Sequence, residues 1–316
     1  MGASASLYLS TLLASPEMSR RGVLLFAAMC VIWGIPYLLI KVAVRDLGPD
    51  VLVFCRTSIG ACLLLPVAAA RGELRPALAR WRPLAAYTVV ELAVPWLLLS
   101  TAEQRLPSSL TALLVAAVPL VGAALAWSLG DRGGLGTRGV VGLALGLAGV
   151  GALVGLDVAG ADLPSVAMVA VVAAGYAIGP AIFARRLRGT PPLGVAAASL
   201  GLCALGFAPF ALLHRPDAAP SARALVAVVV LGVLCTAVAF VLFFELIAEV
   251  GPVRATVFTY VNPAVAVVLG VAFLGERIGW ATAAGFVLVL AGSFLATTPR
   301  PPRPVVAVPA ATVAEP

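Results

Sequence analysis

The sequence predicts an all-α integral membrane protein whose ten transmembrane helices form two five-helix halves inserted in opposite orientations. Of its 316 residues, 62% are hydrophobic and 11% are charged, and the mean hydropathy is +1.08. A soluble domain has about a quarter charged residues. A 25-residue segment also occurs twice, from Pro107 to Asp131 and from Pro252 to Glu276. This repeat indicates that the chain contains two copies of one unit.

Ten apolar stretches approach the length of about 20 residues that a spanning helix needs. They comprise residues 22–45, 49–70, 84–103, 108–129, 138–155, 165–185, 193–213, 223–247, 252–275 and 279–297. We expect residues 22–155 and 165–297 to be the two repeats, joined by LDVAGADLP. Residues 1–21 are expected to form a cytoplasmic N-terminal segment, beginning at Met1 or Met18, and residues 298–316 a disordered cytoplasmic tail.

An odd number of spans in each half determines the predicted topology. A five-helix unit ends on the opposite side of the membrane from its start, so its second copy must insert inverted. Fourteen of the 21 basic residues lie in segments predicted on the side of the N-terminus and six on the other side. The positive-inside rule therefore predicts that both termini are cytoplasmic. One Lys against 20 Arg suggests a bacterial genome rich in GC, and we expect a bacterial inner (cytoplasmic) membrane.

The two copies of the repeated segment share an order of helix signals. In each copy a Pro opens an apolar helix, a second Pro lies near mid-helix, at Pro119 and Pro263, and a Gly followed by an acid closes the helix. At 1.5 Å per residue, each mid-helix Pro lies about 17 Å into the membrane. Pro119 and Pro263 are therefore predicted to approach the membrane midplane from opposite faces and to border a substrate cavity.

These features resemble a known family of membrane proteins. The segment FFELIAEVGPVRATVFTYVNPAVAVVLGVAFLGERIG, residues 243–279, resembles the signature of EamA-type repeats in the drug/metabolite transporter superfamily. Trp33-Gly34 and PWLLLSTAEQRLPSSL, residues 95–110, resemble the first repeat, and Asp131 and Glu245 depart from the common pattern. The resemblance implies a secondary carrier, commonly a proton-coupled exporter of small metabolites or drugs by alternating access.

Helix-breaking residues at matching positions of inverted halves indicate where a transport site lies. The first helix carries Gly34-Ile35-Pro36-Tyr37 and the sixth carries Gly175 to Pro180, at an offset of 143 residues. Backbone freed by such a Pro is tolerated in a bilayer only beside protein or a water-filled cavity. A packing kink explains any single Pro equally well, but the matched pairs favour a cavity. The candidate cavity residues on these helices are Trp33, Pro36, Tyr37, Tyr176 and Pro180, with Trp96 from the third helix.

Polar side chains near Pro263 extend this list of candidates. Tyr260 is a candidate cavity residue, and Asn262 is the only Asn in the chain. The Asn262 amide either binds the backbone carbonyl freed by Pro263 or faces substrate, and we favour the structural role.

Charged residues inside a membrane span cost about 2.5 to 3.5 kcal/mol on insertion scales, so each is a functional hypothesis. Arg56 and Glu91 are predicted about 10 and 18 Å from the outer surface. Either the two form a buried ion pair, or Glu91 binds a proton or a cationic substrate. Glu245 is interpreted as an interfacial residue, and Lys41 either anchors to lipid headgroups or faces the cavity. Asp131 and Glu276 are interpreted as helix-boundary signals that could form gate-side ion pairs. The glycines of the fifth and tenth helices predict a scaffold or a homodimer surface.

Other function classes find less support in the sequence. The short loops lack the clustered acid, His or Ser/Lys pairs that a membrane-embedded enzyme needs, so no catalytic residue is expected. A lipid-linked or nucleotide-sugar translocator would favour several basic groups in the cavity, and only Arg56 is found there. No ATP-binding loop, metal site, cofactor or nucleic-acid partner is predicted. The expected partners are a small-molecule substrate, the lipid bilayer and protons as coupling ion.

Overall fold

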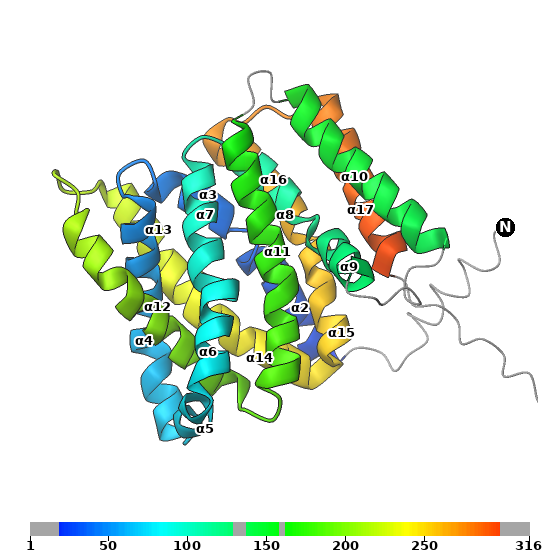
Figure 1. Cartoon of the computed structure of the whole chain (residues 1–316). Coiled ribbons are helices and arrows are strands. Elements are labelled where there is room, and N and C mark those ends of the chain that lie inside the picture. Colours follow the sequence, from blue (N-terminus) through cyan, green and yellow to red (C-terminus); the bar gives the residue numbers. More distant parts are fainter. Residues whose placement is uncertain (1–18, 129–136, 158–161, 298–316) are drawn as a thin grey trace, which may run out of the picture.

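The structure is a computed structural model that describes residues 19–128, 137–157 and 162–297. These residues form long helices packed side by side (Figure 1). Eight helical spans are long and apolar enough to cross a membrane, and two shorter apolar segments, Arg138–Leu153 and Thr282–Ala296, lie in the fifth and the tenth helix along the chain. The predicted all-helical membrane fold with two five-helix repeats is confirmed. The expectations for Asp131, the N-terminal segment before Ser19 and the C-terminal tail lie outside the described residues.

The first repeat contains elements up to α10. They are α2 (Arg20–Ile32), α3 (Pro36–Ala43), α4 (Pro49–Ala70), α5 (Leu74–Ala79), α6 (Trp81–Tyr87), η1 (Thr88–Ala93), α7 (Val94–Glu103), α8 (Ser108–Val115), α9 (Val118–Ser128) and α10 (Thr137–Asp157).

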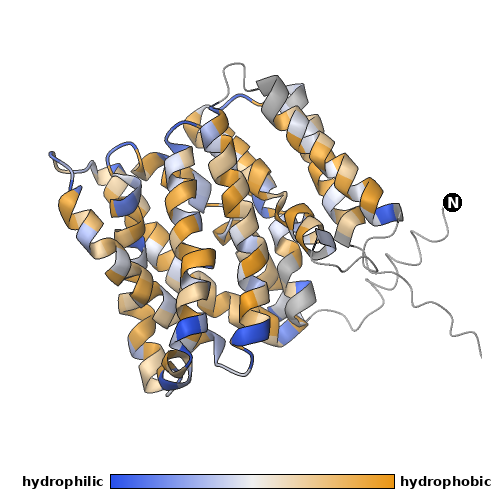
Figure 2. Cartoon of the chain, viewed as in Figure 1, coloured by the Kyte–Doolittle hydropathy of each residue, from blue (hydrophilic) through white to orange (hydrophobic). Residues whose placement is uncertain are grey.

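The second repeat begins with α11. Its elements are α11 (Leu163–Arg186), α12 (Pro192–Leu213), α13 (Ala222–Gly232), η2 (Val233–Val238), α14 (Ala239–Val250), α15 (Pro252–Ala255), η3 (Thr256–Tyr260), α16 (Asn262–Leu274) and α17 (Trp280–Thr297). Hydrophobic residues cover the length of the helices and hydrophilic residues gather at their ends (Figure 2). Many apolar side chains are exposed along these helices, including Leu24, Leu205 and Phe273, as expected of surfaces that face lipid.

Helix pairing follows the internal repeat. The second helix of each repeat packs on its counterpart (α4 on α12), as do the fourth (α8 on α16) and the fifth (α10 on α17). The first helix of each repeat packs on the third helix of the other, in the contacts of α2 with α14 and of α11 with α7. The interface between repeats is thus built from symmetry-related contacts.

Three of the four predicted interruptions are breaks in the helix. The first spanning helix breaks between Ile32 and Pro36, the fourth between Val115 and Val118, and the ninth contains the 3-10 turn η3 before Asn262. The sixth helix differs from the prediction, because α11 continues through Pro180. Single prolines are tolerated in a membrane helix when neighbouring groups satisfy the freed carbonyl.

Glycines bring α10 and α17 into backbone contact. A Cβ atom on Gly142 would lie 2.7 Å from the Gly292 carbonyl oxygen, and one on Gly149 would lie 2.8 Å from the Gly285 carbonyl oxygen. Only helices without side chains at these positions can approach so closely. The glycine pattern that predicted a packing surface therefore joins these two helices within one chain.

Candidate functional site

A buried arginine lies where the two repeats meet. Arg56 on α4 is 7% exposed, and its Nε donates a 3.0 Å hydrogen bond to Oγ1 of Thr236 on η2. Its guanidinium carbon lies 3.7 Å from the centroid of the Trp96 ring on α7. Arg56 and Trp96 belong to the first repeat and Thr236 to the second, so the cluster spans both halves.

Within the part of the chain that the structure describes, the partners of Arg56 are a ring and a hydroxyl, with no counter-ion. The ion pairs among the described residues do not include it. A desolvated cation–π contact contributes about 2 kcal/mol, and a hydrogen bond to a charged group about 1.5 to 3 kcal/mol. Together these offset the insertion cost of the arginine. Its two terminal nitrogens make no hydrogen bond within the described residues, which leaves a bidentate donor for an anionic group.

The third spanning helix of each repeat contains a short π-helical segment, η1 and η2. The two segments start 145 residues apart, the same separation as Pro107 and Pro252. Glu91 is the fourth residue of η1, and Thr236 is the fourth residue of η2. Short π-helical segments occur frequently at functional sites, and here they place Glu91 and Thr236 at equivalent positions of the two repeats.

Glu91 packs against Gly179 of the second repeat. Its Oε2 is buried and has no hydrogen bond among the described residues. A Cβ atom on Gly179 of α11 would overlap its carboxylate, so the missing side chain of Gly179 makes the room that Glu91 occupies. The ion pair with Arg56, one of the two sequence interpretations, does not form, because Arg56 binds Thr236 and Trp96 instead.

Aromatic side chains surround the first-helix break. Trp33 donates from Nε1 to the Cys235 carbonyl of η2 at 3.3 Å. Its ring centroid lies 5.0 Å from that of Phe243 and 5.2 Å from that of Phe258. Two clusters of buried apolar residues lie nearby, one that includes Cys235 and one that includes Trp96. Tyr176 on α11 packs against both clusters, and Tyr37 packs against the one with Cys235. The predicted residues Trp33, Tyr37 and Tyr176 thus lie on the helices that enclose this region.

The predicted residues near the broken helices take different positions. Pro36 opens α3, Pro119 is in the first turn of α9, and Pro263 is in the first turn of α16. With its amide oriented to satisfy both atoms, Asn262 donates to the carbonyls of Cys30 and Phe258 at 3.0 Å each. The bond to Cys30 joins α16 to α2, and the bond to Phe258 joins α16 to η3. Tyr260 is half-buried in η3, whereas Pro180 is exposed on α11.

A second polar cluster lies at the end of the bundle where α7 ends and α8 begins. The Glu276 carboxylate accepts hydrogen bonds from the backbone nitrogens of Ser108 and Ser109, at 2.7 and 3.0 Å. It also accepts from their hydroxyls, at 3.0 and 2.5 Å. We call this contact the Glu276 clasp. Glu276 was predicted as a boundary signal or a gate-side ion pair, and instead it caps a helix of the other repeat. Burial raises the pKa of Glu276, but the hydrogen bonds from Ser109 and Ser108 outweigh it and hold that pKa below its ordinary value.

Two more groups near the clasp depart from the predictions. The Lys41 ammonium, expected at lipid headgroups or in the cavity, donates to the carbonyls of Glu103 and Leu106, at 2.6 and 2.9 Å. Glu103 was not among the predicted residues. Its side chain is fully buried, and neither oxygen has a hydrogen bond among the described residues. The sequence did offer a signal, because Glu103 ends an apolar span just before the Pro that opens the repeated segment.

Polar contacts also join the repeats at the opposite end of the bundle, where α2 begins. Arg21 and Glu245 form an ion pair at 2.7 Å, and the Ser19 hydroxyl hydrogen-bonds to Glu249. Both pairs connect α2, or the residue that caps it, to α14. Polar contacts between the repeats therefore lie at both ends of the bundle, and the Arg56 cluster lies between those ends.

Comparison with known proteins decides the family. The model of the EamA-like transporter family matches twice, over residues 20–155 and 163–298. The chain belongs to the EamA-like transporter family. It is 30% identical over 295 residues to the uncharacterized inner membrane transporter YedA of Escherichia coli K12, covering 89% of this chain and 92% of that protein. The YedA proteins of E. coli O6:H1 and O157:H7 match equally.

A solved crystal structure shares the fold of this chain. It matches with a TM-score of 0.63 and 24% identity, over 89% of this chain and 98% of the other. The family is one of transporters and not of enzymes. The two matched segments show that the chain contains two EamA repeats.

Proposed function

We propose that this EamA-like protein is a secondary carrier that exports small organic solutes by alternating access, with the solute bound beside Arg56. The observation that carries the proposal is a desolvated guanidinium between the two repeats that has no counter-ion among the residues of known position. Interactions at both ends of the bundle connect the repeats. These are the elements that alternating access requires: a central site, and contacts on either side that can close in turn.

The chemistry of Arg56 favours a solute with a carboxylate. A guanidinium offers a planar pair of donors that matches a carboxylate, and this pairing gains strength away from water. Trp96 fixes the plane of the guanidinium, and Thr236 occupies Nε. The aromatic rings around Trp33 supply apolar surface for the rest of the solute. Amino acids and small organic acids fit this arrangement better than a nucleotide sugar, whose diphosphate would call for several cations.

Glu91 is the proposed proton site. A carboxylate without a partner is costly to bury, so such a group favours the protonated form. Its position matches that of Thr236 in the other repeat, which touches Arg56 directly. Protonation of Glu91 and binding of solute at Arg56 would then act on symmetry-related segments. We further propose a bacterial cytoplasmic membrane with both termini on the cytoplasmic side, supported by the distribution of basic residues.

The test is transport by purified protein in proteoliposomes with an imposed proton gradient. Amino acids, small organic acids and amphipathic cations are screened, and wild type is compared with Arg56→Gln and with Arg223→Gln, an exposed control. We expect gradient-driven flux of a carboxylate solute that Arg56→Gln abolishes and Arg223→Gln preserves. Flux of cations alone, or flux unchanged in Arg56→Gln, would refute the carboxylate site. Flux that still responds to the gradient in Glu91→Gln would refute the proton site.

A further inference from the structure

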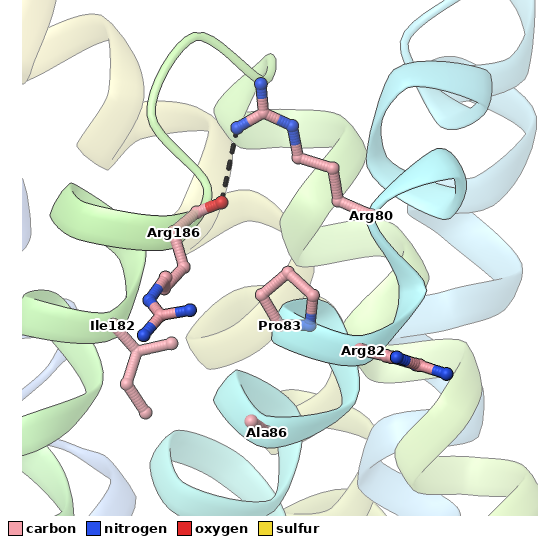
Figure 3. A pocket seen from close by; sticks show the side chains of 6 residues that line it. All are labelled: Arg80, Arg82, Pro83, Ala86, Ile182 and Arg186. Carbon is pink, nitrogen blue, oxygen red and sulfur yellow. Dashed lines mark hydrogen bonds between the residues drawn. The ribbon is translucent and has the colours of Figure 1, made fainter.

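We propose that the pocket between α6 and α11 binds the headgroup of an anionic phospholipid. This pocket of about 660 Å³ is lined by Arg80, Arg82, Pro83, Ala86, Ile182 and Arg186. It lies at the end of the bundle where α2 begins, away from the Arg56 cluster. Figure 3 shows Arg186 and Ile182 on the α11 side and Pro83 and Ala86 on the α6 side. Arg80 reaches across toward Arg186, whereas the Arg82 side chain extends away from Arg186.

The charge around the pocket is strongly one-sided. Two segments border the pocket, residues 71–82 and 185–190. Together they contain seven arginines and one acidic residue, Glu73. The ion pairs among the described residues include none of the three pocket arginines. A basic pocket between membrane helices on the cytoplasmic side is the arrangement that binds anionic lipid headgroups.

The geometry holds one arginine in place and leaves the other two for a ligand. Arg80 donates from Nη1 to the carbonyls of Arg186 and Arg188, at 3.2 and 2.9 Å. It thereby ties the start of α6 to the loop after α11 and keeps the two walls of the pocket together. The side chains of Arg82 and Arg186 make no hydrogen bond among the described residues, so their guanidinium groups offer donors to a phosphate.

The apolar part of the pocket favours a lipid over a soluble phosphate. Pro83, Ala86 and Ile182 belong to membrane-spanning helices, so acyl chains attached to a bound headgroup can continue along them. Trp81 is 61% exposed at the start of α6, and Leu78 is 50% exposed on α5. Exposed Trp side chains are typical of the membrane interface, and the Arg82 guanidinium lies 5.4 Å from the Trp81 ring.

The experiment measures lipid binding by the full-length protein in detergent. Phosphatidylglycerol and phosphatidylcholine with matched acyl chains are titrated, and native mass spectrometry counts the bound lipid. The test variant is Arg80→Gln/Arg82→Gln/Arg186→Gln. The matched control is Arg45→Gln/Arg223→Gln/Arg277→Gln, which removes the same charge at exposed arginines at the other end of the bundle. Each arginine near a headgroup is worth about fivefold in affinity, so we expect about a hundredfold weaker phosphatidylglycerol binding in the test variant only.

A second variant separates the loss of lipid binding from the structural role of Arg80. Arg82→Gln/Arg186→Gln keeps the hydrogen bonds of Arg80, and we expect about 25-fold weaker binding from the loss of two arginines. Equal affinity for the two lipids in wild type would overturn the proposal, as would equal losses in the test and control variants. Soluble glycerol 3-phosphate serves as a probe without acyl chains. If it raised the melting temperature as much as phosphatidylglycerol and competed fully with it, the site would be a phosphate site and not a lipid site.

Discussion

Breaking the Glu276 clasp should open the end of the bundle where α8 begins. Glu276→Ala removes the acceptor of four hydrogen bonds from Ser108 and Ser109. Losing a helix cap costs about 1 kcal/mol, and hydrogen bonds to a charged acceptor contribute about 1.5 to 3 kcal/mol. Because the carboxylate is half-buried, we take the lower part of this range, about 2 kcal/mol in total. The ratio of closed to open states should then fall about 30-fold.

The assay is the rate at which a membrane-impermeant maleimide labels Ser100→Cys, with the labelled site identified by mass spectrometry. Ser100 is 2% exposed on α7, one turn before Glu103. We expect about 30-fold faster labelling in Glu276→Ala and about fivefold in Glu276→Gln, which keeps one acceptor oxygen. Glu245→Ala removes a carboxylate at the opposite end and serves as the control, with no acceleration. Labelling of Ser100→Cys at the same rate with and without Glu276 would refute the reasoning.

Three further predictions follow from the packing and the charges. Gly179→Ala places a methyl group against the Glu91 carboxylate, so it should reduce transport at least tenfold. The control is Gly206→Ala, whose added Cβ has no other atom within 4 Å and which should leave flux unchanged. Equal flux in the two variants would contradict the contact. The Cβ atom added by Gly292→Ala would lie 2.5 Å from the Gly142 carbonyl oxygen, so this variant should lose about 1 to 3 kcal/mol of stability. The loss is measured as a lower melting temperature. The control Gly151→Ala, whose added Cβ has no other atom within 4 Å, should keep the wild-type melting temperature. The lowered pKa of Glu276 means that its ionised form stabilises the folded protein above the unfolded pKa of about 4.3, and that this contribution is lost as pH falls through the lowered value. Labelling of Ser100→Cys, corrected for thiol reactivity with a free peptide, should therefore stay constant from about pH 8 to 5 and rise only below about pH 4; a rise near pH 6 would contradict the assignment.

The membrane spans could be predicted because each has a local sequence pattern of its own. Apolar runs of about 20 residues bounded by Pro, Gly or charged residues predicted ten helices, and the structure contains helices over all of them. The glycine spacing in residues 139–151 likewise predicted a close helix contact, which α17 provides. Such features depend on residues near one another in the chain, so a single sequence reveals them.

The partner of Arg56 could not be predicted in the same way. Depth in the membrane can be estimated from sequence, and it suggested Glu91. However, Glu91 and Thr236 occupy equivalent places in inverted copies, so a similar depth fits both. The choice depends on which helix faces α4, and that is a matter of tertiary packing. The two π-helical segments carry no recognised residue pattern, and their equivalence became visible only in the structure.

The Glu276 clasp shows the same limit. Glu276 is separated from Ser108 by 168 positions, and nothing near Glu276 in the chain identifies its partner. Its place beside Arg277 at the end of a helix favoured a boundary signal or a gate-side ion pair. The helix N-terminus at Ser108 supplies two backbone donors and two hydroxyls instead, which is a stronger set of partners for a carboxylate.

Solute counterflow tests the central claim most directly, because it detects a carrier without any assumption about the coupling ion. Proteoliposomes loaded with an unlabelled carboxylate solute are diluted into a trace of the same labelled solute at equal pH on both sides. The account predicts a transient accumulation of label in wild type and in Arg223→Gln, and none in Arg56→Gln. Absence of counterflow for every amino acid and organic acid tested, or the same accumulation in Arg56→Gln, would contradict it.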